Sequence, residues 1–255
     1  MLRSTTLATD GLHVFRGFLS VAERQAALRT AAALSARAHQ QAARSSRPEV
    51  ISGTHNVNSL EKFKRVSLTL EDGRTSNCEH FGEYGDGHRL TYFRGILPST
   101  GVPRLLERIA AIGELQEEVA SSRQRHEKTA DAPWKWRLTL NHYPPASGLT
   151  ERKGFPWHRD LIANGAATMI LNLGAPGGLE FGEEPNTESE TPVDGMLYSS
   201  DHTVAPGASV EALESITLND GDLLLLTGRA RWEYVHRVLP SAGGGERATL
   251  VYGVW

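Results

Sequence analysis

The stretch Gly154-Phe155-Pro156-Trp157-His158-Arg159-Asp160 places an imidazole and a carboxylate two positions apart. Side chains on an extended strand alternate between its two faces, so we expect His158 and Asp160 to point to one side and Arg159 to the other. Together they supply two ligands of a metal site built from two histidines and one carboxylate. The pattern alone is weak, because a surface histidine beside a solvated aspartate gives the same sequence.

Several short apolar runs surround this motif, each bounded by glycine, proline or aspartate. They cover residues 134–143, 168–173, 215–218, 223–226 and 248–252. Many short strands separated by turn residues are typical of a β-sandwich or barrel. The acidic, poorly periodic segment 183–209 interrupts the series, and we interpret it as an insertion between strands and not as a linker between domains.

The N-terminal half predicts helices and a hairpin. Ser20 and Glu23 have the capping-box spacing, and the alanine-rich run that follows should be helical to about residue 39. Strand-like residues 63–70 lead into the hairpin signal Asp72-Gly73. Apolar residues at helical spacing between 105 and 112 predict a further helix, which we expect to continue on the surface through the charged run 116–128.

Composition limits the class of protein. The chain has 255 residues, 39% hydrophobic and 22% charged, enough for a full globular core, and we find no domain boundary in it. A net charge of −3 argues against a dedicated polyanion binder. The single cysteine, Cys78, excludes an intrachain disulfide and fits a reducing compartment, the cytoplasm or, in a eukaryote, the nucleus. No apolar run reaches the length of a membrane span.

Further polar residues follow the same alternation. His236 comes after an apolar strand and a glycine and can complete the metal site, with His142 and His202 as the next candidates. Arg247 and Thr249 share one face of the last strand, where a guanidinium and a hydroxyl can grip one carboxylate. Asn141 and Tyr143 also share a face. Each residue alone has an ordinary structural explanation, and Arg237 is a rival carboxylate-binding arginine, but the order of the whole set is informative.

With these residues in this order, the chain resembles the AlkB-like branch of the Fe(II)/2-oxoglutarate-dependent dioxygenases. The resemblance spans residues 134–255 and is carried by Asn141-His142-Tyr143, His158-Arg159-Asp160, the run 226–236 and Arg247-Ala248-Thr249. It implies an α+β, mainly β fold, a double-stranded β-helix (jelly roll) with N-terminal helices packed on one sheet. Residues 1–255 would form one domain, with 1–130 as an N-terminal extension with substrate-side elements and 134–255 as the catalytic core.

The same resemblance implies the cofactors and the reaction. Fe(II) would be bound by His158, Asp160 and His236, which are therefore the catalytic residues. 2-Oxoglutarate would be held by Arg247 together with Asn141, Tyr143 and Thr249. Using O2, the family oxidises 2-oxoglutarate to succinate and CO2 and couples this to hydroxylation or N-demethylation of an organic substrate.

Two departures bear on that substrate. Nucleic-acid-repairing AlkB proteins usually carry an acidic residue where this chain has Ile162, and a second arginine where it has Gly253. We therefore favour a small molecule or a protein side chain as substrate. A demethylase of N-methylated DNA or RNA bases is the second possibility, with helix arginines and Lys62, Lys64 and Arg65 as its phosphate contacts. A non-catalytic jelly-roll binding protein is the third.

Overall fold

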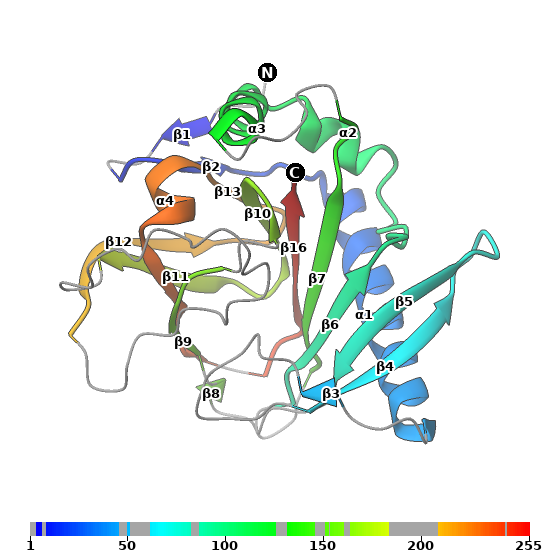
Figure 1. Cartoon of the computed structure of the whole chain (residues 1–255). Helices are drawn as coiled ribbons and strands as arrows, with labels where there is room; N and C mark the ends of the chain where they lie inside the picture. The colour runs from blue at the N-terminus through cyan, green and yellow to red at the C-terminus, as the bar shows by residue number, and fades with distance from the viewer. Residues whose placement is uncertain are drawn as a thin grey trace.

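The computed structural model describes residues 4–6, 9–45, 50–51, 62–82, 87–125, 132–145, 151–152, 154–160, 164–183, 209–242 and 244–255. Within these residues the chain is mainly β. A large and a small antiparallel sheet face each other, and the longest helix lies along the outer face of the large sheet (Figure 1).

The large sheet contains ten strands. In spatial order they are β1 (Ser4–Thr6), β2 (Leu12–Phe15), β13 (Leu223–Leu226), β10 (Ala167–Gly174), β16 (Arg247–Val254), β7 (Trp136–Tyr143), β6 (Arg89–Arg94), β5 (Thr75–Phe81), β4 (Lys62–Thr69) and β3 (Val50–Ile51). The last strand of the chain, β16, therefore lies in the middle of the sheet between β10 and β7.

The small sheet contains four strands, in the order β12 (Glu211–Leu218), β11 (Gly177–Glu183), β14 (Val235–Val238) and β9 (Phe155–His158). A separate pair is formed by β8 (Glu151–Arg152) and β15 (Ser241–Ala242). From β7 onward, the chain crosses repeatedly from the large sheet to the small sheet and back. Residues distant in sequence therefore meet in the space between the two sheets.

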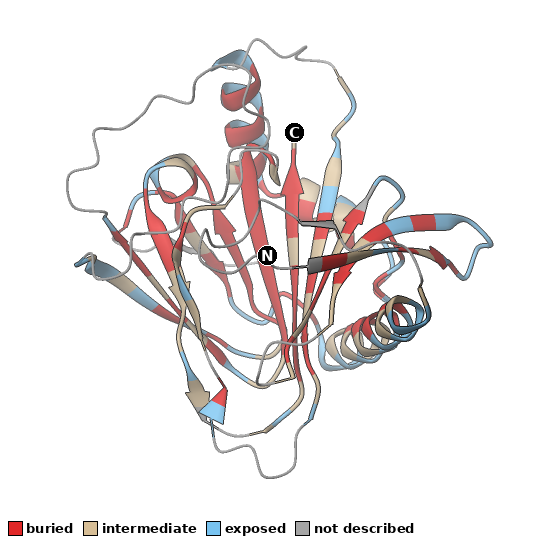
Figure 2. Cartoon of the chain, turned by 60° about the horizontal axis from the view of Figure 1, so that its bottom comes forward, coloured by how far each residue is buried: buried red, intermediate tan, exposed pale blue. Residues whose placement is uncertain are grey.

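The helices in the described part of the chain are α1 (Val21–Arg44), α2 (Leu105–Ala110), α3 (Gly113–Arg125) and α4 (Gly228–Trp232). The predicted capping box at the start of α1 is confirmed: Glu23 N–H donates to Ser20 Oγ, and Ser20 N–H donates to the Glu23 carboxylate. The helix continues five residues beyond its predicted end. Its buried face packs on the large sheet while the opposite face is exposed (Figure 2).

Alternation along the strands gives the large sheet two different faces. On β7, Leu138 and Leu140 belong to the apolar core under the helices, whereas Thr139, Asn141 and Tyr143 face the space between the sheets. A second apolar core fills part of that space. The predicted strands after residue 134 and the hairpin at Asp72-Gly73 are confirmed, the latter by the pairing of β4 with β5.

One helix prediction was wrong. We expected residues 105–128 to form a continuous helix with a surface-exposed second half, but α2 ends at Ala110 and a new helix begins at Gly113. The buried Ile112 occupies the break, and its N–H donates to the Ile109 carbonyl in a tight turn. The second half is not only a surface helix either, because Glu118 and Arg123 of α3 are buried. Burial of the Ile112 side chain favours the break, and the low helix propensity of glycine makes it less costly.

Other predictions lie outside the described residues, among them Ile162, His202 and nearly all of the expected insertion 183–209. Among the residues that the structure does describe, no helix has the length and apolar character needed to cross a membrane.

Candidate metal centre

Two strands of the small sheet bring His158, Asp160 and His236 together. His158 ends β9, Asp160 follows two residues later, and His236 lies on β14 directly opposite His158 in the strand register. The two imidazole rings are 4.2 Å apart between centroids. One potential ligand atom from each of the three side chains lies within 4.8 Å of the others. In the described part of the chain, no other group of three or more such residues is placed to hold a metal ion.

The surroundings of the triad fix the orientation of its members. Nδ1 of His158 lies 2.8 Å from the carbonyl oxygen of Pro156. Because a carbonyl can only accept, Nδ1 carries a proton, and in the neutral form of the ring the lone pair is then on Nε2, as a metal ligand requires. Arg231 on α4 donates to the carbonyl oxygens of Asp160 and Gly165, at 3.2 and 3.1 Å. It therefore holds the backbone before and after residues 161–163, which lie outside the described ranges.

A buried carboxylate on α3 holds α4 in turn. Glu118 accepts a hydrogen bond from the backbone N–H of Gly228 at 3.0 Å and from the indole nitrogen of Trp232 at 3.3 Å. A negative charge at the N-terminus of a helix is favourable, because the first amides of the helix have no partners within it. The position of Asp160 therefore depends on a chain of contacts that starts at α3.

The electrostatics of the triad favour a cation. Burial lowers the pKa of His236 to about 3, with His158 adding to the effect, so His236 is neutral near neutral pH. Burial alone would raise the pKa of Asp160, but His236, Arg231 and His158 together hold it below its ordinary value. Asp160 Oδ2 is buried and has no hydrogen-bond partner. An aspartate carboxylate beside two imidazoles is a ligand set that suits Fe(II), so these residues fit the metal that the resemblance implies.

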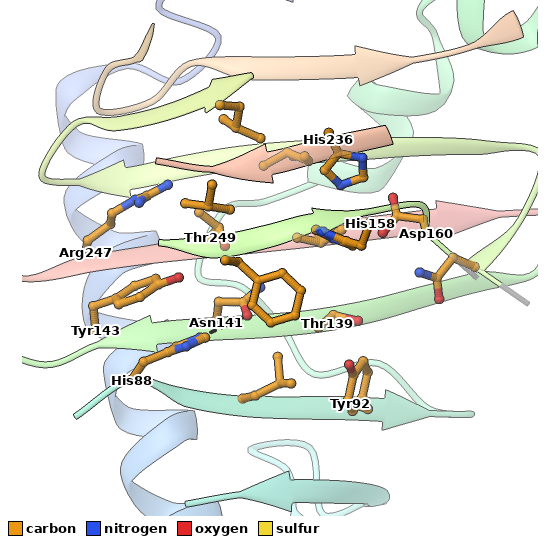
Figure 3. A pocket seen from close by; sticks show the side chains of 17 residues that line it. His88, Tyr92, Thr139, Asn141, Tyr143, His158, Asp160, His236, Arg247 and Thr249 are labelled. Atoms are coloured by element: carbon orange, nitrogen blue, oxygen red, sulfur yellow. Dashed lines mark hydrogen bonds between the residues drawn. The ribbon is translucent and has the colours of Figure 1, made fainter. Parts of the chain in front are cut away.

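The triad opens into a cavity between the sheets. Strand pairing arranges the floor of this cavity in rows, which can be followed in Figure 3. Arg247 lies opposite Tyr143, Thr249 opposite Asn141, and Val251 opposite Thr139. All seven residues that the sequence predicted for the site line this one cavity: His158, Asp160, His236, Asn141, Tyr143, Arg247 and Thr249.

Arg247 occupies one end of the cavity and is only 3% exposed. Its Nε donates to Asn172 Oδ1 at 2.9 Å, and its guanidinium carbon lies 5.3 Å from the centre of the Tyr143 ring. Gly177 makes room for it, since a Cβ there would come within 2.0 Å of the guanidinium. Burial lowers the pKa of Arg247. None of the carboxylates that the structure describes forms an ion pair with this buried cation, so it suits an acidic ligand.

The rival candidates lie elsewhere. Arg237 pairs with Glu180 at 2.5 Å and lies over the Trp157 ring, and it does not line the cavity. Nε2 of His142 lies 3.1 Å from Glu246, and its side chain is absent from the cavity lining because neighbouring residues on β7 point to opposite faces. Arg247 and His236 therefore keep the roles that the order of the sequence suggested for them as hypotheses.

Sequence reasoning missed several lining residues: His88, Tyr92, Thr139 and Asn164. The alternation of His88, Leu90 and Tyr92 on and before β6 was visible in the sequence, but the pairing that sets β6 beside β7 was not.

The backbone of Asn164 explains why position 253 is a glycine. A Cβ at position 253 would lie 1.7 Å from the Asn164 carbonyl oxygen, so a side chain there has no space.

Comparisons with known proteins give a limited result. No protein-family model matches the chain, and no curated protein matches it either. Among solved structures, that of OsALKBH1 is similar over 97% of this chain and 100% of its own, with a TM-score of 0.45 and 12% sequence identity. A similarity at this level assigns neither a family nor a function to this chain.

Proposed function

We propose that this chain is an AlkB-like Fe(II)/2-oxoglutarate-dependent dioxygenase that oxidises a C–H bond of a small molecule or a protein side chain. The observation that carries the proposal is the pairing of two unsatisfied features in one cavity. A His-His-Asp cluster with a partnerless carboxylate oxygen lines the same cavity as a buried arginine that has no carboxylate partner among the described residues. A metal ion and a dicarboxylate would satisfy both.

The residues have distinct roles in this proposal. His158, Asp160 and His236 hold Fe(II), which, when bound, supplies the oxidative chemistry that protein side chains lack. Arg247 binds the far carboxylate of 2-oxoglutarate through charge-assisted hydrogen bonds, with the Tyr143 and Thr249 hydroxyls and the Asn141 amide beside it. Three ligands from the protein leave the remaining coordination positions for the co-substrate and O2.

The apolar lining of the cavity has its own role. Ile170, Leu179 and Val238 border the polar groups. An apolar wall keeps bulk water away from the reacting centre and strengthens the electrostatic interactions inside it. The chain therefore positions and shields its ligands, as expected of a protein that leaves the difficult chemical step to a cofactor.

The strand order supports a jelly-roll assignment for this core. From β7 to β16, the chain contributes β7, β10, β13 and β16 to the large sheet and β9, β11, β12 and β14 to the small one. Eight antiparallel strands shared between two sheets in this way are typical of double-sheet jelly rolls. We also propose that residues 1–255 form a single domain.

The preference for a substrate other than nucleic acid rests on charge. Of the cavity-lining residues that the structure describes, Arg247 is the one lysine or arginine, and the proposal assigns it to the co-substrate. On α1, Arg24 contacts Asp220 and Arg37 contacts the Thr69 carbonyl, on the far side of the large sheet from the cavity. Phosphate contacts produce a steep dependence of affinity on salt, so a salt titration with a single-stranded oligonucleotide tests this preference.

Succinate release tests the proposed function. Purified protein with Fe(II), 2-oxoglutarate and O2 should form succinate even without an added substrate, and a chelator should stop the reaction. The Asp160→Ala variant is the matched control and should form none. If the wild type binds one Fe(II) but forms no succinate with any substrate in a panel of small molecules, peptides and methylated oligonucleotides, the chain is instead a binding protein.

A further inference from the structure

His88 lies at the co-substrate end of the cavity, just before β6. It is 7% exposed, and its ring lies flat against that of Tyr143, with 4.2 Å between centroids and 10° between planes. The next residue, Arg89, pairs with His142 on β7, so the register places His88 opposite Tyr143. His88, Tyr143 and Arg247 thus follow one another across three neighbouring strands (Figure 3).

A hydrogen bond connects His88 to a second residue of this end. Its Nε2 lies 3.1 Å from Asn141 Oδ1. Because an amide oxygen accepts hydrogen bonds, His88 Nε2 is the donor in this arrangement. The oxygen and nitrogen of the Asn141 amide point in different directions. Because the oxygen is bound by His88, the nitrogen is the atom that faces the cavity that Asn141 lines. Asn141 therefore presents a donor, the group that a carboxylate requires.

We infer that His88 is a positioning residue that selects this orientation of the Asn141 amide and thereby strengthens binding of 2-oxoglutarate. The inference rests on the proposed function. The two amide orientations differ by a half-turn and have almost the same shape, so packing discriminates poorly between them. Without a donor at position 88, the amide can turn its oxygen toward the ligand, and two acceptors would then face each other.

The contact of His88 with Tyr143 has a related effect. A flat aromatic stack restricts the tilt of the phenol ring, which also lies near the guanidinium groups of Arg247 and Arg152. However, stacking alone would only support the wall of the cavity. The hydrogen bond to Asn141 makes a more specific prediction, because its loss should matter only while an amide is present at position 141.

A double-mutant cycle tests this directly. We would measure the affinity of 2-oxoglutarate for the protein loaded with Mn(II), which is inert under these conditions, by calorimetry. His88→Leu should weaken binding about tenfold, the loss expected for one hydrogen bond to a charged group. Asn141→Ala should have a similar effect, and the double variant should bind no more weakly than Asn141→Ala alone. His88→Gln keeps a donor at similar reach and should restore most of the affinity.

Controls separate this role from a general effect on folding. His80→Leu removes another buried histidine, which is hydrogen-bonded to Thr91 at 2.9 Å on the helix side of the sheet, and should leave 2-oxoglutarate affinity unchanged. Mn(II) affinity should be the same in all variants. Normal binding by a folded His88→Leu protein, or effects of His88→Leu and Asn141→Ala that multiply, would overturn the inference. Failure of the wild type to bind 2-oxoglutarate would reject the proposed function itself.

Discussion

The space between the two sheets has two contrasting halves. Toward β2, β12 and β13 it is filled by an apolar core that includes Leu12, Phe181, Leu218 and Leu224, all fully buried. Toward β6, β7 and β9 it is a cavity in which imidazoles, hydroxyls, a carboxylate, two amides and a guanidinium are set among apolar side chains. Ile170 of β10 belongs to both, so the same strands serve both halves.

This difference shows how the fold separates stability from function. Close packing in the apolar half sets the spacing of the sheets. The strands then continue as rigid supports into the half that contains the cavity, where they hold chemically reactive side chains at fixed positions around open space. Asp160 Oδ2 is buried without a hydrogen-bond partner, and Arg247 is buried without a carboxylate partner among the described residues. Burying charged groups in this way is costly, and in our account a bound ligand offsets that cost. The following changes test whether the two halves are independent in this way.

Loss of the metal ligands should have the largest effect. We expect Asp160→Ala or His236→Ala to abolish Fe(II)-dependent succinate formation, since two ligands do not hold the metal in the required geometry. The melting temperature of the metal-free protein should change little, because both residues lie outside the apolar half. Near-normal succinate formation by His236→Ala would contradict the assignment and return attention to His142 and His202.

Arg247→Ala should raise the apparent KM for 2-oxoglutarate by one to several orders of magnitude, because loss of one side of a buried charge pair costs roughly 2–5 kcal/mol. Arg247→Lys should restore only part of this, since an ammonium cannot make the two-pronged contact. The stability of the ligand-free protein should not fall, because the removed charge was buried without a carboxylate partner among the described residues. Arg237→Ala is the matched control, and a KM increase there but not at Arg247 would reverse the assignment.

A core substitution should have the opposite profile. Leu224 is fully buried in the apolar half, so Leu224→Ala should lower the free energy of unfolding by about 2–5 kcal/mol. At a temperature where the variant is still folded, its KM for 2-oxoglutarate should match that of the wild type. Denaturant unfolding and steady-state kinetics on the same preparation measure both quantities. A large KM change would mean that the two halves are not independent.

The smallest effect is expected from Gly177→Ala. The added Cβ would lie within 2.0 Å of the Arg247 guanidinium, which is the far end of a flexible side chain and can move aside. We expect KM for 2-oxoglutarate to rise by less than in Arg247→Ala, with little change in unfolding free energy. An unchanged KM would show that the position of the guanidinium is not set by the space that Gly177 leaves.

Much of this site could be predicted from the sequence because strand alternation is a local property. It correctly placed Asn141 with Tyr143, and Arg247 with Thr249, on common faces. Long-range register is not local. Nothing in the sequence set Arg247 opposite Tyr143 or brought His88 beside Asn141, and local patterns could not show that Arg237, the rival to Arg247, pairs with Glu180 away from the cavity. The break between α2 and α3 depends on the burial of Ile112, which is likewise a tertiary effect.

The central claim is that the triad and Arg247 bind one ligand together, and the affinity for 2-oxoglutarate with and without metal tests it most directly. If the ligand contacts both the metal and Arg247, the first contact holds the ligand where the second can form without a further loss of ligand freedom. Saturating Mn(II) should therefore tighten 2-oxoglutarate binding by roughly 100-fold or more. This gain should disappear in Asp160→Ala, while the weak metal-free binding remains. An affinity that is the same with and without Mn(II) would contradict the account.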